Sequence, residues 1–417
     1  MANSSNRTQI VRLPIWTAYE ASHLLPTPQT KPSPMIRRYY FAITLLLLAG
    51  FLSACAGDST APPTTGTLEF NLVTTGVDID ADGFVLKIDG DFPRGIPANG
   101  TVSLAMPPGT YTLDLSGLAF NCDVTTAPAS VEVTLGATTP VDVRASCTPY
   151  LRNVIVYTSE EFGIPELMVM RPDGSRRDRL TFDQTGYAAP VVSPDGQSIA
   201  VAVYTGGWNG IYLLDRFGKG RTKLVGNSNF DGSPAWSPDG TKIAFRSSLH
   251  GPYGDYGRIF IVNRDGTGLR QLTPEVAATD YKYDDSPSWS PDGTRLVFGR
   301  SGVLYLINAD GTGLISTGAI GDSSSWSPDG TQIAYMSVNG GNDGLWAMNG
   351  SFTTRRLTTP VQADQSPRWS PDGTQLVFAR IESNVSQLYK MNADGSGATK
   401  LSTVPKHNSQ ASWSKNF

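Results

Sequence analysis

The sequence predicts an all-β protein in which a small β-sandwich is followed by a six-bladed β-propeller. Three features carry this prediction: a tetrapeptide repeated at spacings of 37–53 residues, alternating apolar and polar residues between its copies, and a separate alternating segment before them. Strand-rich units with a period near 40–45 residues are typical of propellers with four strands in each blade. The tetrapeptide Ser-Pro-Asp-Gly occurs at residues 193–196, 237–240, 290–293, 327–330 and 370–373.

Residues 1–54 are predicted to be an upstream extension followed by a secretory signal peptide. Arg37 and Arg38 precede an apolar run over residues 39–51, which is short for a membrane span. The run ends in Leu52-Ser53-Ala54-Cys55, which resembles the bacterial lipobox and implies lipidation of Cys55. The alternative is an ordinary signal peptide with a chance cysteine.

The same segment predicts a lipid-anchored protein of the cell envelope, either periplasmic or on the outer membrane or cell surface. Met35 begins a signal of normal length, so it is an alternative start to Met1. Ala56 after the cysteine is not aspartate, and by resemblance to the sorting rule of enteric bacteria this favours the outer membrane. Residues 55–66 are predicted to be a flexible lipidated tether.

Residues 67–148 are predicted to form a small β-sandwich. Apolar and polar residues alternate there with the period of two that marks strands with one buried face. Turn-forming pairs such as Asp89-Gly90 and Pro108-Gly109 separate the strands. The segment resembles the immunoglobulin-like spacer domains of surface lipoproteins. The expected strands are 67–72, 84–88, 102–104, 111–115, 131–135 and 141–144.

Cys122 and Cys147 are predicted to form a disulfide within this small domain. A secreted protein folds in an oxidising compartment, where paired cysteines usually form a bridge. A buried reduced pair is the alternative.

Asp78, Asp80 and Asp82 have the alternate spacing of a calcium-binding loop. A strand rather than a helix follows them, so an Asp/Gly hairpin turn is the alternative. The sequence predicts no cofactor, and calcium at these three residues is the one metal hypothesis.

The propeller is predicted to span residues 150–417, and one repeat shows the internal order of a blade. A short strand ends in Trp236, a Ser-Pro-Asp-Gly turn follows, and three further strands complete the unit. A tryptophan recurs at the same position in four other copies, and we expect these rings to pack between blades. The four strands expected in this repeat are 231–236, 242–246, 258–263 and 270–273.

The first blade is predicted to combine both ends of the propeller sequence. Residues 154–157, 166–170 and 179–181 match the second to fourth strands of the repeat, and the missing first strand is supplied by 410–413. Strand exchange of this kind would close the ring and remove two free sheet edges.

The repeat Trp-Ser-Pro-Asp-Gly, followed by an Ile-Ala-Phe-type strand and a Leu-Thr stop, resembles the TolB-like propeller repeats of bacterial envelope proteins. The resemblance covers about residues 150–417. It implies a six-bladed propeller that acts by binding other proteins. The segment before residue 150 does not resemble the N-terminal domain of TolB.

Composition and motifs favour a binding protein over an enzyme. Residues 55–417 carry 28 Lys and Arg against 36 Asp and Glu, an acidic balance that argues against nucleic acid as a partner. No nucleophile elbow, zinc motif or phosphate loop occurs, and His250 and His407 lie in different repeats. The prediction is a non-catalytic scaffold for an envelope protein or peptide. The alternative is a propeller-channel carbohydrate-binding protein or a lyase-type enzyme.

Carboxylates recur near the start of the tryptophan strand and are predicted to ring one mouth of the central channel. If this strand is innermost, they could attract a cation or a basic peptide. The alternative is that each aspartate caps a turn of its own repeat. The candidate residues are Asp231, Asp284, Asp285, Asp322 and Asp364.

Overall fold

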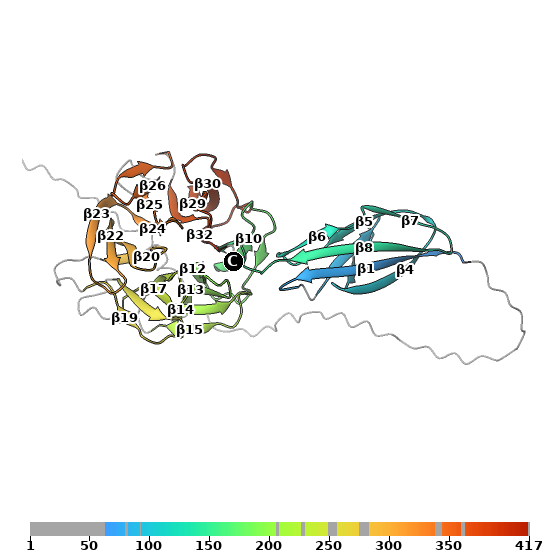
Figure 1. The fold of residues 1–417 in the computed structure, drawn as a ribbon, viewed down its shortest axis with the longest axis horizontal. Coiled ribbons are helices and arrows are strands. Elements are labelled where there is room, and N and C mark those ends of the chain that lie inside the picture. Colours follow the sequence, from blue (N-terminus) through green and yellow to red (C-terminus); the bar gives the residue numbers. More distant parts are fainter. Residues whose placement is uncertain are drawn as a thin grey trace, which may run out of the picture. The chain divides into compact units, whose positions relative to one another are not determined.

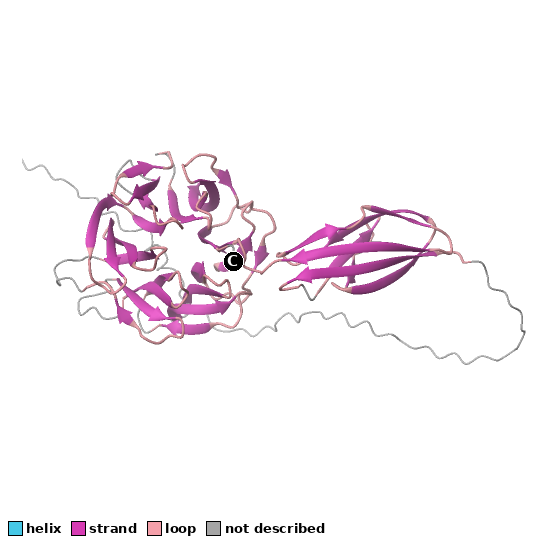
Figure 2. Cartoon of the chain, in the orientation of Figure 1, coloured by secondary structure: helices cyan, strands magenta, loops and turns pink. Residues whose placement is uncertain are grey.

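The computed structural model describes nine ranges of the chain, and within them it consists of strands without helices (Figures 1 and 2). The all-β prediction is therefore confirmed. The predicted signal peptide, Cys55 and most of the tether lie outside the described residues. Among those described, no helix is long and apolar enough to cross a membrane. The ranges are 63–79, 82–91, 93–205, 208–226, 230–248, 257–274, 283–337, 344–359 and 363–415.

The small domain consists of two four-stranded sheets, ordered β4-β1-β8-β6 and β3-β2-β5-β7. Its strands β1 and β8 pair in parallel and bury one face each, with Phe70 and Val143 fully enclosed. Each segment that the alternation marked as a strand overlaps an observed one. The bounds are β1 (Gly66–Gly76), β2 (Phe84–Ile88), β3 (Arg94–Ile96), β4 (Gly100–Met106), β5 (Gly109–Ser116), β6 (Cys122–Thr126), β7 (Ser130–Val133) and β8 (Thr138–Cys147).

The predicted disulfide is present. Cys122 on β6 lies directly opposite Cys147 on β8, with 4.0 Å between their Cα atoms. Both side chains are buried, so the bridge ties the edge strand β6 to the centre of its sheet.

The remaining strands form six four-stranded sheets, which are the blades. In blades two to six, the four strands follow one another in the chain. Their bounds are β12 (Tyr187–Val192), β13 (Ser198–Thr205), β14 (Trp208–Asp215), β15 (Thr222–Val225), β16 (Asp231–Trp236), β17 (Lys242–Ser247), β18 (Arg258–Asn263), β19 (Arg270–Gln271), β20 (Asp284–Trp289), β21 (Arg295–Arg300), β22 (Val303–Asn308), β23 (Ile315–Ile320), β24 (Asp322–Trp326), β25 (Gln332–Ser337), β26 (Gly344–Asn349), β27 (Thr354–Arg356), β28 (Asp364–Trp369), β29 (Gln375–Glu382), β30 (Val385–Asn392) and β31 (Thr399–Lys400).

The first blade joins strands from both ends of the propeller. Its order is β11-β10-β9-β32, and Trp413 of β32 pairs with Ile155 of β9. The first strands of neighbouring blades contact one another in a closed cycle, which places them innermost around the ring's centre (Figure 1). The bounds are β9 (Ile155–Ser159), β10 (Glu166–Met170), β11 (Asp178–Arg179) and β32 (Asn408–Trp413).

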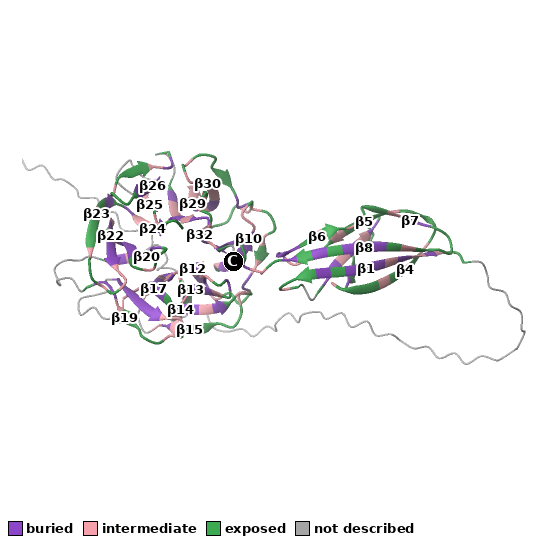
Figure 3. Ribbon diagram, in the orientation of Figure 1, coloured by how far each residue is buried: buried purple, intermediate pink, exposed green. Residues whose placement is uncertain are grey.

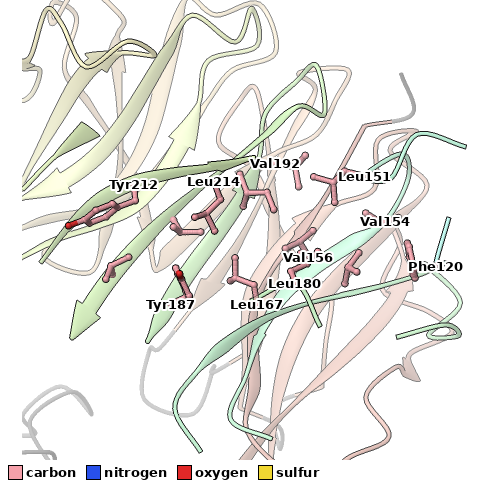
Figure 4. Close-up of a cluster of buried hydrophobic side chains, with 14 residues drawn as sticks. Phe120, Leu151, Val154, Val156, Leu167, Leu180, Tyr187, Val192, Tyr212 and Leu214 are labelled. Atoms are coloured by element: carbon pink, nitrogen blue, oxygen red, sulfur yellow. The ribbon is translucent and has the colours of Figure 1, made fainter. Parts of the chain in front are cut away.

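The cores of the propeller lie between blades. In the cluster of Figure 4, Val156 and Leu167 of the first blade share a core with Val192 and Leu214 of the second. Every residue of β9 and β10 is buried, because these middle strands have a neighbouring blade on each face (Figure 3). The strict alternation of strands with one wet face therefore does not hold in the middle of a blade.

The repeated tetrapeptide is a structural turn. In the third intact copy, the Ser290 hydroxyl donates to Asp292 at 2.6 Å and accepts from the backbone N–H of Arg295 at 3.0 Å. The Asp292 carboxylate also accepts from the N–H of Thr294 at 3.0 Å. Gly293 has a φ of 71°, a conformation that favours glycine. The same serine–aspartate bond occurs in all five copies, which explains the repeat without a ligand.

We predict that Ser290→Ala destabilises the protein by about 1–2 kcal/mol, because it leaves the buried side of the turn without its hydroxyl partner. The Ser290 and Thr294 hydrogen bonds lower the pKa of Asp292 to about 2. A carboxyl whose pKa is lower in the folded state stabilises the fold at pH values above its pKa in the unfolded chain. This contribution is lost as the pH falls through its pKa in the folded protein. Urea unfolding from pH 5 to pH 2.5 should therefore show a weaker pH dependence in the variant. An unchanged profile and unchanged midpoint would contradict this role.

Candidate functional site

The innermost strand of every blade carries a bulge at the same place. In β20, the pairing register with β21 shifts between Asp285 and Ser288. The residue at the bulge has a φ between 47° and 53° although it is not glycine. Because bulges redirect strand side chains, these positions can reach the next blade. They are Ala189, Ser233, Ser286, Ser323, Ser366 and Gln410.

Two carboxylates lie beside this bulge on the fourth and fifth blades. Asp285 accepts hydrogen bonds from the Ser233 hydroxyl of the third blade at 2.9 Å and from the N–H of Ser286 at 2.6 Å. Asp322 accepts from the N–H of Ser323 at 2.5 Å. We call Asp285 and Asp322 the acidic pair, and the side of the ring where the innermost strands begin the entry face.

Cationic and aromatic side chains surround the acidic pair. Arg246 Nη1 lies 3.4 Å from Asp285 Oδ2, and its guanidinium stacks 4.4 Å from the centre of the Phe230 ring. The Tyr204 ring stacks on the Phe230 ring, with 5.4 Å between the two ring centres. The Asp285 and Arg246 side chains are 23% and 20% exposed, so the pair is accessible from the solvent.

The acidic pair behaves as one electrostatic unit. Burial raises the pKa of Asp322 to about 6, and the neighbouring Asp285 charge adds to the rise. Burial also raises the pKa of the Tyr204 and Tyr283 hydroxyls, reinforced at Tyr204 by Asp285 and Asp231 and at Tyr283 by both members of the acidic pair. Among the described residues, one arginine, Arg246, faces these two carboxylates, so binding of a further cation at the site would be favourable.

Three of the predicted rim carboxylates are buried instead. Asp284 forms a bidentate ion pair with Arg300, at 2.5 and 2.7 Å, and Asp364 forms the equivalent pair with Arg380, at 2.7 and 3.0 Å. Asp231 at the same repeat position is also fully buried. Alternate strand residues point to opposite faces, so these side chains enter the blade. The prediction that Asp231, Asp284 and Asp364 face the channel mouth is therefore wrong, and Asp285 and Asp322 are the candidates that stay partly exposed.

The calcium hypothesis concerns residues with other partners. Asp78 is ion-paired with Arg216 and accepts a hydrogen bond from the N–H of Tyr150 at 3.0 Å. Asp80 lies outside the described residues, whereas Asp82 is among them. Within the part of the chain that the structure describes, no group of three or more His, Cys, Asp or Glu side chains is placed to hold a metal.

At the opposite side of the ring lies a cavity of about 730 Å³, bordered by tryptophans and prolines of the repeated turns. We call this side the turn face. The Trp236, Trp289 and Trp369 rings are at most 8% exposed. Their indole N–H groups donate to backbone carbonyls of the preceding blade at 3.1–3.2 Å. The expected packing role of these tryptophans is therefore confirmed.

Sequence reasoning did not find Arg246, Tyr204 or Phe230, and it did not connect Tyr283 with the acidic pair. They precede or end strands of three different blades, and no fixed spacing links them to the acidic pair. The sequence does place an aromatic residue, Phe230 or Tyr283, directly before β16 and β20. These residues indicate a site at the ring's centre only once the first strand of each blade is known to be innermost.

A closed ring of four-stranded blades defines the class of β-propeller domains. The chain belongs to the TolB β-propeller domain family, PD40, whose pattern matches residues 152–349 and 316–416.

Curated relatives and solved structures agree with this assignment. A TolB homologue from Chlorobium luteolum is 32% identical over 144 residues, which is 34% of this chain and 30% of that protein. The Tol-Pal system protein TolB of Anaeromyxobacter dehalogenans is 29% identical over 30% of this chain and 27% of its own length. This chain thus spans less than a third of each relative. The crystal structure of TolB from Acinetobacter baumannii matches the fold with a TM-score of 0.55 and 22% identity, covering 63% of this chain and 67% of that one.

We predict that Asp322→Asn stabilises the protein at neutral pH. Folding raises the pKa of the Asp322 carboxyl, so ionisation costs stability as pH rises from about 4 to about 6. The amide oxygen can still accept from the N–H of Ser323, while the charge facing Asp285 is removed. Thermal unfolding at pH 7.5 should give a higher midpoint for the variant, and the difference should vanish near pH 4. A lower midpoint at pH 7.5 would contradict the assigned repulsion.

Proposed function

We propose that this protein is a non-catalytic lipoprotein of the cell envelope whose TolB-like propeller binds a protein or peptide through its entry face. The observation that carries the proposal is the acidic pair. Among the described residues its two interacting carboxylates face one arginine, and aromatic rings surround them on a rigid ring of strands. Rigid scaffolds with exposed aromatic and charged groups suit the recognition of a partner segment. The ligand that fits is a segment with Lys or Arg.

The family and the sequence together support the envelope role. The relative from Anaeromyxobacter dehalogenans is named for the Tol-Pal system, and this chain belongs to the TolB β-propeller domain family. The lipobox-like Leu52-Ser53-Ala54-Cys55 supports export and lipid anchoring, with residues 55–66 as the tether. In this proposal residues 67–148 are an immunoglobulin-like spacer between tether and propeller. The pairing of β32 with β9 supports closure of residues 150–417 by strand exchange.

The acidic pair is tested by recovering partners from solubilised envelopes. Asp285→Asn with Asp322→Asn should lower recovery about tenfold, as expected for a loss of roughly 1.4 kcal/mol. The loss should be largest at low salt, because screening weakens exposed charge contacts. The matched control, Asp114→Asn with Glu132→Gln, removes two exposed carboxylates from the small domain. Equal recovery of the same proteins by the double variant would refute this site.

Lipidation is tested separately at Cys55. Cys55→Ala should release the protein from membranes into the soluble fraction, because no acyl chain can be attached. Mass spectrometry of the mature wild-type N-terminus should show acylated Cys55. An unmodified N-terminus, or a Cys55→Ala variant that stays in the membrane fraction, would refute the lipid anchor. Neither outcome bears on the acidic pair, which the recovery experiment tests by itself.

A further inference from the structure

Two rings of equivalent residues border the cavity of the turn face, and each ring has one charged member. The inner ring is the residue before the tryptophan position. Five of its members are uncharged and one is arginine. The ring consists of Val191, Ala235, Ser288, Ser325, Arg368 and Ser412, all of which border the cavity.

The outer ring is the second residue of the repeated turn. It is proline in the five intact copies and lysine in the decayed copy that ends the chain. Its members are Pro194, Pro238, Pro291, Pro328, Pro371 and Lys415, and these too border the cavity. Both departures from the repeat thus introduce a positive charge.

The two cations belong to neighbouring blades. Arg368 lies on β28 of the sixth blade, and Lys415 follows β32 of the first blade. The strands β28 and β32 contact each other in the innermost cycle. The positive charge is therefore concentrated on one side of the cavity instead of being spread around it.

Arg368 has no carboxylate within ion-pair distance among the described residues. The hydrogen bond described for its guanidinium runs from Nη1 to the backbone carbonyl of Pro367 at 2.9 Å. Burial lowers the pKa of Arg368 to about 10, with no opposing charge to offset it. Arg300 and Arg380 show the contrast, since each is engaged by a buried aspartate. The Arg368 side chain is partly exposed, and that exposure is toward the cavity it borders.

The carboxylate that borders the cavity is committed to its own turn. Asp372 accepts hydrogen bonds from the Ser370 hydroxyl at 2.6 Å and from the N–H of Thr374 at 3.0 Å. It repeats the bonds of the other four turns, and it forms no ion pair with Arg368. No ion pair engages Arg368 or Lys415 within the described ranges, so on these residues their charge is available to a ligand from outside.

The geometry points to a carboxylate-binding site on the turn face, in which Arg368 and Lys415 hold an acidic peptide segment in the cavity. A guanidinium binds a carboxylate through two parallel hydrogen bonds, a geometry that suits a C-terminus or a Glu or Asp side chain. The cavity is bordered by the prolines of the repeated turns and by five tryptophans, and the indole N–H groups of all of these except Trp326 donate to protein oxygens. Sugars stack on exposed ring faces, which the buried Trp236, Trp289 and Trp369 do not offer. Trp326 is half-buried, and the Arg295 guanidinium lies 5.8 Å from its ring centre. Trp413 alone among these five described rings is half-buried without such a cover, so a peptide fits better than an acidic oligosaccharide.

This site goes beyond the proposed function, because it lies at the other end of the innermost strands from the acidic pair. It also selects a ligand of opposite charge. The two sites can therefore fail or succeed independently.

The test is calorimetric titration of the purified protein with tetraglutamate, tetraglutamine and tetragalacturonate. Wild type should bind tetraglutamate about tenfold more tightly than the uncharged tetraglutamine, as one strong charge-assisted contact allows. Arg368→Gln should weaken tetraglutamate binding about tenfold, and Lys415→Gln about two- to threefold because it is exposed. Arg144→Gln, which removes an exposed arginine of the small domain, should change nothing.

Folding is monitored in the same variants. Arg368→Gln removes a charge without a carboxylate partner, so its melting temperature should equal or exceed that of wild type. Asp285→Asn with Asp322→Asn should leave tetraglutamate binding unchanged. Equal tetraglutamate affinity in wild type and Arg368→Gln would overturn the site, and tighter binding of tetragalacturonate than of tetraglutamate would overturn the peptide assignment.

Discussion

The propeller depends on the burial of each blade between two others. A four-stranded sheet with apolar residues on both faces cannot be stable alone, and the described residues form an apolar cluster at each of the six blade interfaces. The interface between the sixth and first blades joins Val377 and Leu388 to Ile155 and Met168. Ala411 of β32, which pairs with β9, is a member of this cluster, and Trp413 of the same strand packs against it.

Ring closure also gives each repeat position a fixed place around the centre. A residue type that recurs is then structural, as the serine–aspartate turn shows, and a residue that departs from the repeat is the informative one. The acidic pair on the entry face and Arg368 with Lys415 on the turn face are such departures. They give opposite charges to the two ends of the innermost strands.

Burial decides what a carboxylate does in this fold. Asp284 and Asp285 are neighbours in sequence, yet Asp284 is enclosed in a bidentate pair with Arg300 and Asp285 stays accessible beside Asp322. A buried pair of this kind cannot be released to a ligand without leaving an isolated charge in the protein interior. A buried carboxylate and a partly exposed one are therefore neighbours on the same strand.

The sequence by itself determined the all-β class, the repeat unit and the strands of residues 231–273, because turn chemistry and strand periodicity are local. It also predicted the pairing of Cys122 with Cys147, from the oxidising compartment of a secreted protein. Only the tertiary structure decided which aspartates reach the centre, since the pleat and the bulge at Ser286 set the direction of each side chain. It also brought Tyr204, Arg246 and Asp322 together from different blades, and placed Arg368 in a ring of uncharged residues. Contacts between blades depend on how sheets stack around a ring, and that information is not present in any single repeat.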